Sequence, residues 1–314
     1  LMLTDDAGRA AGKIAACQLV ELLNASKGIL SREEPEDIHN MRVAIRRIRT
    51  ALRIFGNYFD KSLDTGFLWG LKKTARRLGY IRDMDVFWIN IDFTLLRNTA
   101  GGASAIEKYR AIINNYNKTY RKKLNAYLAG EGYSRMMDGI ESFVEKVLSP
   151  QYQGNQKFGA QLEVIMPVLI SEKFAGVIGY SRGIEKDELS VEDYHDLRIA
   201  VKRFRYTLEF FSDLLPSEVK TLIKKLKGLQ DYLGTLQDST VAIDLLKMHK
   251  GRVDFSEGDG LERIINEKLA GFMDYQIEKH IQCIGEKVGG FGPQWDWFKG
   301  KAFKKAMGKI LRPA

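Results

Sequence analysis

The residues best suited to bind an anion are a histidine and several arginines that recur at helical spacing within residues 38–55. They form one row made up of His39, Arg42, Arg46, Arg49 and Arg53, and Arg47 lies beside it. On an α-helix, steps of three and four residues place side chains on one stripe, here about 21 Å long. A guanidinium group can donate paired hydrogen bonds to phosphate oxygens. The row therefore predicts binding of a phosphate-rich anion.

The same pattern occurs again 156 residues later, where Glu36–Arg49 aligns with Glu192–Arg205. Every basic position of the first copy is basic in the second, whose basic residues are His195, Arg198, Lys202, Arg203 and Arg205. Glu209 stands where the first copy has Arg53, so the second row is shorter. Duplication of one unit explains this repeat. We therefore predict two similar domains, residues 1–150 and 151–314.

Two further segments, one in each half, add candidate binding residues, namely Lys72, Lys73, Arg76, Arg77, Lys224 and Lys227. Between residues 36 and 82, eleven Lys and Arg stand against four Asp and Glu, so this segment carries most of the chain's net charge of +9. A solvated helix face normally mixes charges, because like charges one turn apart repel each other. The duplicated, uncompensated rows favour a binding surface, and a plain solvated face is the alternative.

The elements that must position these rows are predicted to be helices. Apolar residues follow each basic row at the same spacing, one position over, as expected for a helix with one face in the core. The expected helices of the first half span 7–30, 36–59, 64–98, 103–129 and 133–148. Those of the second half span 158–183, 190–213, 217–249, 258–288 and 298–310. No segment alternates as a half-buried strand does, so the predicted fold class is all-α.

Other chemistry finds little support in the sequence. The Glu36-x-x-His39 spacing also occurs in di-iron bundles, but Arg42 one turn further would repel a metal. No nucleotide-binding or hydrolase motif is present, so we expect no catalytic residue, no metal and no cofactor. The aromatic residues follow helical spacing that is typical of core packing. The remaining histidines, His249 and His280, are isolated and expected at the surface.

The sequence also predicts the cellular compartment. Cys17 and Cys283 are far apart and form no disulfide framework. No apolar run approaches the roughly 20 residues that span a bilayer. We therefore expect a protein of the reducing cytoplasm that does not enter the membrane.

The segment His39-x-x-Arg42-x-x-x-Arg46-Arg47-x-Arg49 and its copy resemble the CHAD family, the "conserved histidine α-helical domain". Arg82-Asp83-Met84-Asp85 resembles the family's Arg-Asp-x-Asp element. The resemblance implies two tandem four-helix-bundle repeats about a pseudo-two-fold axis, with a basic central groove. It also implies binding of inorganic polyphosphate without turnover, often at polyphosphate granules. The ligand-facing residues that it implies are His39, Arg42, Arg46, Arg49, His195, Arg198, Lys202 and Arg205.

Many CHAD proteins also carry a triphosphate-tunnel (CYTH) domain, but its Glu-x-Glu-x-Lys motif is absent from this sequence. We therefore expect a stand-alone member and do not carry over triphosphatase activity. The predicted partner is inorganic polyphosphate or another polyanion. Two alternatives stay open. One is RNA or DNA binding through the same rows, and the other is a phosphoryl-transfer enzyme in which His39 or His195 accepts the phosphoryl group.

Overall fold

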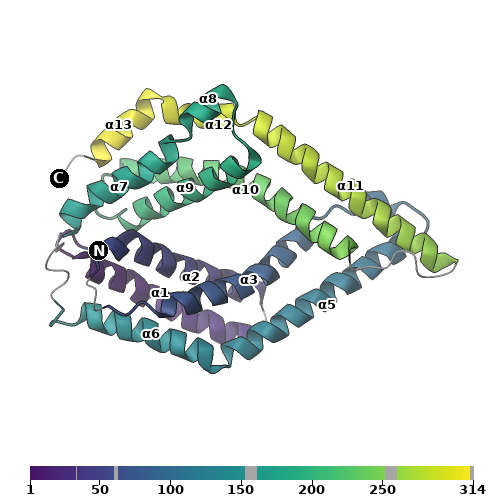
Figure 1. Cartoon of the computed structure of the whole chain (residues 1–314), viewed down its shortest axis with the longest axis horizontal. Coiled ribbons are helices and arrows are strands. Elements are labelled where there is room, and N and C mark those ends of the chain that lie inside the picture. The colour runs from purple at the N-terminus through teal and green to yellow at the C-terminus, as the bar shows by residue number, and fades with distance from the viewer. Residues whose placement is uncertain (33, 60–62, 153–160, 252–259, 312–314) are drawn as a thin grey trace. The chain divides into compact units, whose positions relative to one another are not determined.

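The computed structural model describes residues 1–32, 34–59, 63–152, 161–251 and 260–311 (Figure 1). Every regular element in these ranges is a helix, which confirms the all-α prediction. The predicted helix starts at 158 and 258, and part of the segment around the predicted domain boundary, lie outside the described residues. None of the helices in the described ranges is long and apolar enough to cross a membrane.

The helices form two compact units. The first combines residues 1–76, 125–233 and 291–314, and the second combines 77–124 and 234–290. Both units draw on both halves of the sequence, so the compact units are not the sequence repeats. The two repeat domains divided at residue 150 stay a prediction.

The first unit contains most of the helices. They are α1 (Ala7–Ser31), α2 (Pro35–Phe55), the 3-10 turn η1 (Gly56–Tyr58), α6 (Glu131–Leu148), α7 (Leu162–Ile178), α8 (Ser181–Lys186), α9 (Val191–Phe210), α12 (Gly292–Lys299) and α13 (Lys301–Ile310). It also holds the first parts of α3 (Phe67–Asn90) and α10 (Glu218–Lys250). Helix α1 packs against α2 and α6, and α7 packs against α9. This packing brings α2 and α9, which carry the two basic rows, into one unit.

The second unit contains the remaining parts of α3 and α10 with α4 (Thr94–Arg97), α11 (Leu261–Gly289) and most of α5 (Gly102–Leu128). Its core includes His249, which is fully buried, so the prediction that His249 lies at the surface is wrong. Nδ1 of His249 and the hydroxyl of Tyr109 form a 2.9 Å hydrogen bond. Burial raises the pKa of Tyr109 far above its usual value. The bond to Tyr109 gives the buried ring a polar partner, and the rings of Phe87, Tyr109 and Tyr116 pack around it.

Helix boundaries differ from the prediction in several places. The helix expected over 36–59 ends at Phe55, the one over 158–183 is divided between α7 and α8, and the one over 298–310 is divided between α12 and α13. The single helix expected over 64–98 ends at Asn90, and α4 begins at Thr94. The Asp92 carboxylate accepts hydrogen bonds from the backbone N–H of Thr94 at 3.0 Å and from its hydroxyl at 2.6 Å. Such local side-chain bonds compete with helix continuation. In addition, α12 begins at Gly292, within a segment that was not expected to be helical.

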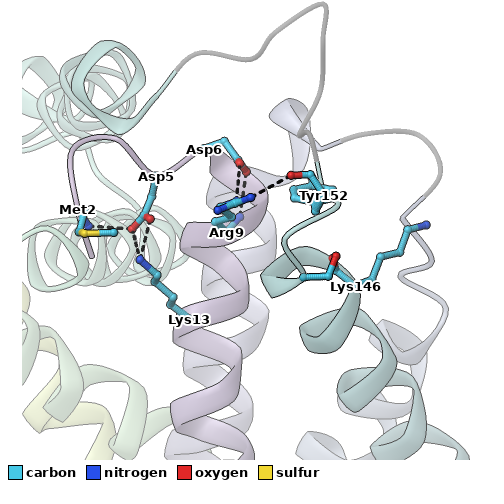
Figure 2. A network of polar contacts seen from close by, with 8 residues as sticks. Met2, Asp5, Asp6, Arg9, Lys13, Lys146 and Tyr152 are labelled. Atoms are coloured by element: carbon cyan, nitrogen blue, oxygen red, sulfur yellow. Dashed lines mark hydrogen bonds and ion pairs between the residues drawn. The ribbon is translucent and has the colours of Figure 1, made fainter.

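The N-terminal segment joins α1 to elements from further along the chain (Figure 2). The buried carboxylate of Asp5 pairs with Nζ of Lys13 at 2.7 Å. Nη2 of Arg9 donates to the carbonyl of Tyr152 at 3.0 Å. The backbone N–H of Leu162 donates to the carbonyl of Asp5 at 2.8 Å. The last of these bonds connects the start of α1 to the start of α7.

We predict that Gly12→Val destabilises the protein. A Cβ at Gly12 would overlap the side chain of Val147 on α6, so α1 and α6 would have to separate. Overpacking of this kind typically costs about 1–3 kcal/mol of unfolding free energy, measurable by urea unfolding followed by circular dichroism. Gly228→Ala on α10 is the control, because nothing lies within 4 Å of a Cβ there and the helix should gain about 0.5–1 kcal/mol. Equal stability of Gly12→Val and the wild type would contradict the α1–α6 packing.

Candidate functional site

Helix α2 presents the first basic row as the sequence predicts. Pro35 occupies the first turn, and Glu36 and Asp37 place acidic side chains at the positive end of the helix dipole. The apolar positions of the helix are buried, namely Ile38, Met41, Ile45, Ile48, Leu52 and Phe55. Burial of this face fixes the rotation of α2, and with it the direction of the neighbouring basic row.

Helix α9 presents the second row in the same way. Ser190 and Asp193 form a capping box at its start, with the Asp193 backbone N–H donating to Oγ of Ser190 at 3.1 Å. Its buried residues again follow the predicted apolar positions, namely Tyr194, Leu197, Val201, Phe204 and Leu208, followed by Phe211. Phe55 and Phe211, which occupy equivalent positions in the two repeats, contact each other edge to face with ring centroids 5.9 Å apart. The two row-bearing helices therefore meet at their C-terminal ends.

The two rows meet within the first unit. Burial and then the charges of neighbouring arginines lower the pKa of Lys202 to about 8, and the arginines concerned are Arg46, Arg198, Arg42 and Arg205. Two of these come from α2 and two from α9. Burial lowers the pKa of Arg53 as well, with further contributions from Arg203 on α9 and Arg49 on α2. Cations of both repeats thus lie close enough to repel one another.

Two of the four arginines around Lys202 have a hydrogen-bond donor without an acceptor. The Nε–H groups of Arg46 and Arg198 are buried and have no acceptor among the described residues. The Arg46 guanidinium lies over the Tyr206 ring, 5.4 Å from its centroid, and cation–π contact does not use an in-plane N–H. A buried donor without an acceptor typically costs about 1–3 kcal/mol. The Nε–H groups of Arg46 and Arg198 therefore each lack an oxygen acceptor.

Arg205 differs from Arg46 and Arg198 because its Nε–H has an acceptor. Its Nε donates to Oε1 of Gln230 at 3.1 Å, and its Nη1 forms an ion pair with Glu209. The guanidinium also lies 4.5 Å from the centroid of the Tyr206 ring. Glu209, the residue that departs from the first repeat, therefore neutralises a cation of its own row.

Helix α3 adds a third set of cations. Lys72, Lys73 and Arg76, together with Arg49 of α2, line a cavity of about 450 Å³. Packing of α3 on α6 sets the direction of these side chains. Gly70 of α3 lies so close to Met136 of α6 that a Cβ at Gly70 would overlap the Met136 side chain. The buried Thr74 hydroxyl donates to the Gly70 carbonyl at 2.8 Å. The opposite, basic face of α3 is left to line the cavity.

The remaining predicted residues are neither among the arginines around Lys202 nor among the residues that line the α3 cavity. His39 is half-buried near the start of α2, and His195 is exposed near the start of α9. Arg47 lines a different cavity, of about 370 Å³, together with Glu209 and Asp213. The other three are the exposed Lys224 and Lys227 on α10, and Arg77, which falls in the second unit.

Sequence reasoning missed three residues that lie next to the cations of the site. Trp69 lines the α3 cavity, Tyr206 lies beneath Arg46, and Gln230 binds Arg205. Trp69 could have been found, because it precedes Lys72 and Lys73 by one helical turn and is out of phase with the core positions of α3. Gln230 could not, since its role depends on how α10 packs beside α9. Within the described ranges, no three His, Cys, Asp or Glu side chains cluster as metal ligands do.

Comparison with known proteins gives a consistent picture of the fold. A family model described as "CHAD domain" matches residues 13–247. The CHAD domain from the plant Ricinus communis has a TM-score of 0.69 at 21% identity, covering 92% of this chain and 94% of that chain. PptA from Streptomyces chartreusis has a TM-score of 0.63 at 15% identity, covering 90% of this chain and 99% of that chain. No curated protein matches.

We predict that Lys202→Met stabilises the protein at neutral pH. Removing a half-buried charge from among four guanidinium groups should raise Tm by about 2 °C, roughly 1 kcal/mol once partial exposure is allowed for. Because folding lowers the pKa of Lys202 from 10.5 to about 8, its destabilising effect is complete below pH 8 and fades as the pH rises towards 10.5. The Tm difference between variant and wild type should shrink over that range in calorimetry. A wild-type Tm above that of the variant at pH 7 would contradict the repulsion.

Proposed function

This chain belongs to the CHAD domain family, and we propose that it binds inorganic polyphosphate without turning it over. The observation that carries the proposal is the meeting of the two basic rows, in which Lys202 of α9 lies among Arg42 and Arg46 of α2. Like charges held together at partial burial destabilise the free protein. Binding of a polyanion would turn that repulsion into attraction.

The arrangement favours an extended anion over a single phosphate. The row on α2 extends about 21 Å along the helix, and the cavity at Lys72 and Arg76 adds further cations in the same unit. A linear chain with a charge on every phosphoryl unit can neutralise successive residues of such a row. The unpartnered Nε–H groups of Arg46 and Arg198 suit phosphate oxygens as acceptors.

Absence of turnover is part of the proposal. Arginine keeps its proton under all ordinary conditions, so the residues that dominate the rows can bind phosphate but cannot act as general bases. The rival view, phosphoryl transfer through His39 or His195, predicts phosphate release or an acid-labile phosphohistidine. Detection of either during incubation with polyphosphate would overturn this part of the proposal.

We further propose a cytoplasmic location, at polyphosphate granules.

The rival partner, RNA or DNA, separates its charges with sugars and carries bases. Titration with long-chain polyphosphate and with single-stranded RNA, side by side at 0.15 M salt, distinguishes the two. Tighter binding of RNA, or affinity that depends on base identity, would replace polyphosphate as the partner.

We predict that Arg46→Ala combined with Arg198→Ala weakens polyphosphate binding about 100-fold or more. Each substitution removes a charge-assisted hydrogen-bond donor, which typically contributes about 1.5–3 kcal/mol. Isothermal calorimetry gives the affinity. Its salt dependence should also become shallower, by about 0.7 in the log–log slope for each phosphate that the variant no longer neutralises.

Arg135→Ala is the matched control, because Arg135 is an exposed arginine on α6 whose 3.9 Å ion pair with Glu131 lies within one helix. It should leave polyphosphate affinity within about twofold of the wild type, as expected for an exposed pair of this kind. Circular dichroism of all variants checks that helicity is retained. The control removes one charge and the double variant two, so a control that loses half as much binding free energy as the double variant would mean that binding is a diffuse charge effect, and the proposed site would fall.

We predict that Glu209→Gln strengthens polyphosphate binding about three- to tenfold. The substitution removes the carboxylate that pairs with Arg205 and so frees a guanidinium for the ligand. Asp213→Asn is the control, since Asp213 lines the same cavity as Glu209 and removing it changes net charge equally. A similar gain in both variants would show that only net charge matters.

A further inference from the structure

The exposed face of α3 carries an indole as well as cations. Trp69 is 68% exposed, whereas Phe67, Leu71 and Thr74 on the other side of the helix are buried. Trp69 precedes Lys72 and Lys73 by one turn, and Arg76 follows one turn later, so all four share one face. Large aromatic side chains are usually buried or used in binding.

The indole and the cations line one cavity. Its volume of about 450 Å³ lies within the usual range of small-molecule sites. Nζ of Lys73 lies 4.6 Å from the ring centroid of Trp69 and 5.5 Å from that of Tyr127. Arg49 reaches the same cavity from α2. The cavity therefore offers a flat apolar ring beside several phosphate-binding groups.

The repeat shows that the fold does not require this indole. In the register that aligns Leu78 with Leu233, Trp69 aligns with Lys224 and Lys72 with Lys227. The second copy thus has lysine at both positions and no aromatic residue there. Inorganic polyphosphate also gives no reason for the indole, because its phosphoryl chain has no apolar or aromatic part.

We propose that this cavity binds a nucleoside 5′-polyphosphate, with the base stacked on Trp69 and the phosphates paired with Arg49, Lys72 and Arg76. The inference rests on the proposed function, since the same cations serve both ligands, and it adds a subsite for a base. A single nucleotide fits better than a nucleic acid strand. Sequence-independent strand binding uses several aromatic platforms in series, whereas Trp69 is the one aromatic among the described residues that line this cavity.

The experiment compares ATP with tripolyphosphate in calorimetric titrations of the whole chain, with EDTA present to remove divalent ions. The two ligands have phosphate chains of equal length, and tripolyphosphate carries at least as much charge. Electrostatics alone therefore predicts that tripolyphosphate binds as tightly as ATP or more tightly. We expect ATP to bind at least about fivefold more tightly, the low end of what one base–aromatic stack contributes.

Substitutions assign the preference to the indole. Trp69→Ala should abolish the preference for ATP, and Trp69→Phe should retain most of it, while both variants still bind long-chain polyphosphate. Tyr80→Ala is the control, because Tyr80 is another exposed aromatic of α3 but does not line the cavity. Nucleotide should also quench the tryptophan fluorescence of the wild type and not that of Trp69→Phe.

The outcomes separate this inference from the proposed function. If long-chain polyphosphate binds but ATP binds no more tightly than tripolyphosphate, the nucleotide subsite is overturned and polyphosphate binding stands. If polyphosphate does not bind, the proposed function falls, and a Trp69-dependent preference for ATP would still support the subsite. If a single-stranded oligonucleotide binds far more tightly than ATP through Trp69, the ligand is a nucleic acid strand and the single-nucleotide inference is overturned.

Discussion

The first unit holds mutually repelling cations close together. This repulsion is the constraint that its packing has to overcome. Lys202 lies among four guanidinium groups, and Arg53 lies near Arg203 and Arg49. Nothing in that crowding favours the folded chain without an anion. What holds the rows together is the apolar packing on the other side of the same helices, including the edge-to-face contact of Phe55 with Phe211. Hydrophobic burial thus opposes electrostatic repulsion, and the balance keeps a high positive potential at the site.

The two repeats share this constraint unequally. The first keeps an uninterrupted basic row and adds the cations of α3, whereas the second places Glu209 beside Arg205. The Glu209 carboxylate relieves part of the repulsion in the free protein and withdraws one guanidinium from the ligand. The indole of the α3 cavity belongs to one repeat, because Trp69 aligns with a lysine in the other half. The two copies of the sequence pattern therefore carry similar basic rows with different chemistry at their edges.

Helix α3 contributes residues to both compact units. Its first turns line the basic cavity, while Met84 and Phe87 near its end belong to the core of the second unit. That core is built from aromatic and aliphatic side chains around the buried pair of Tyr109 and His249. One helix can line the basic cavity and also enter a core because its exposed face is basic near its start, while Met84 and Phe87 are buried near its end.

The sequence alone determined the helical class, the repeat, the buried face of α2 and α9, and the identity of the basic rows. It could do so because helical periodicity is local: the spacing of apolar residues fixes which side of a helix is buried, and hence which side carries charge. Only the tertiary structure decided that the rows meet, that Arg205 is occupied by Gln230 and Glu209, that His249 is buried, and that Trp69 lines a cavity. These facts depend on contacts between residues far apart in the chain, and the spacing within one helix carries no information about which helix will pack beside it.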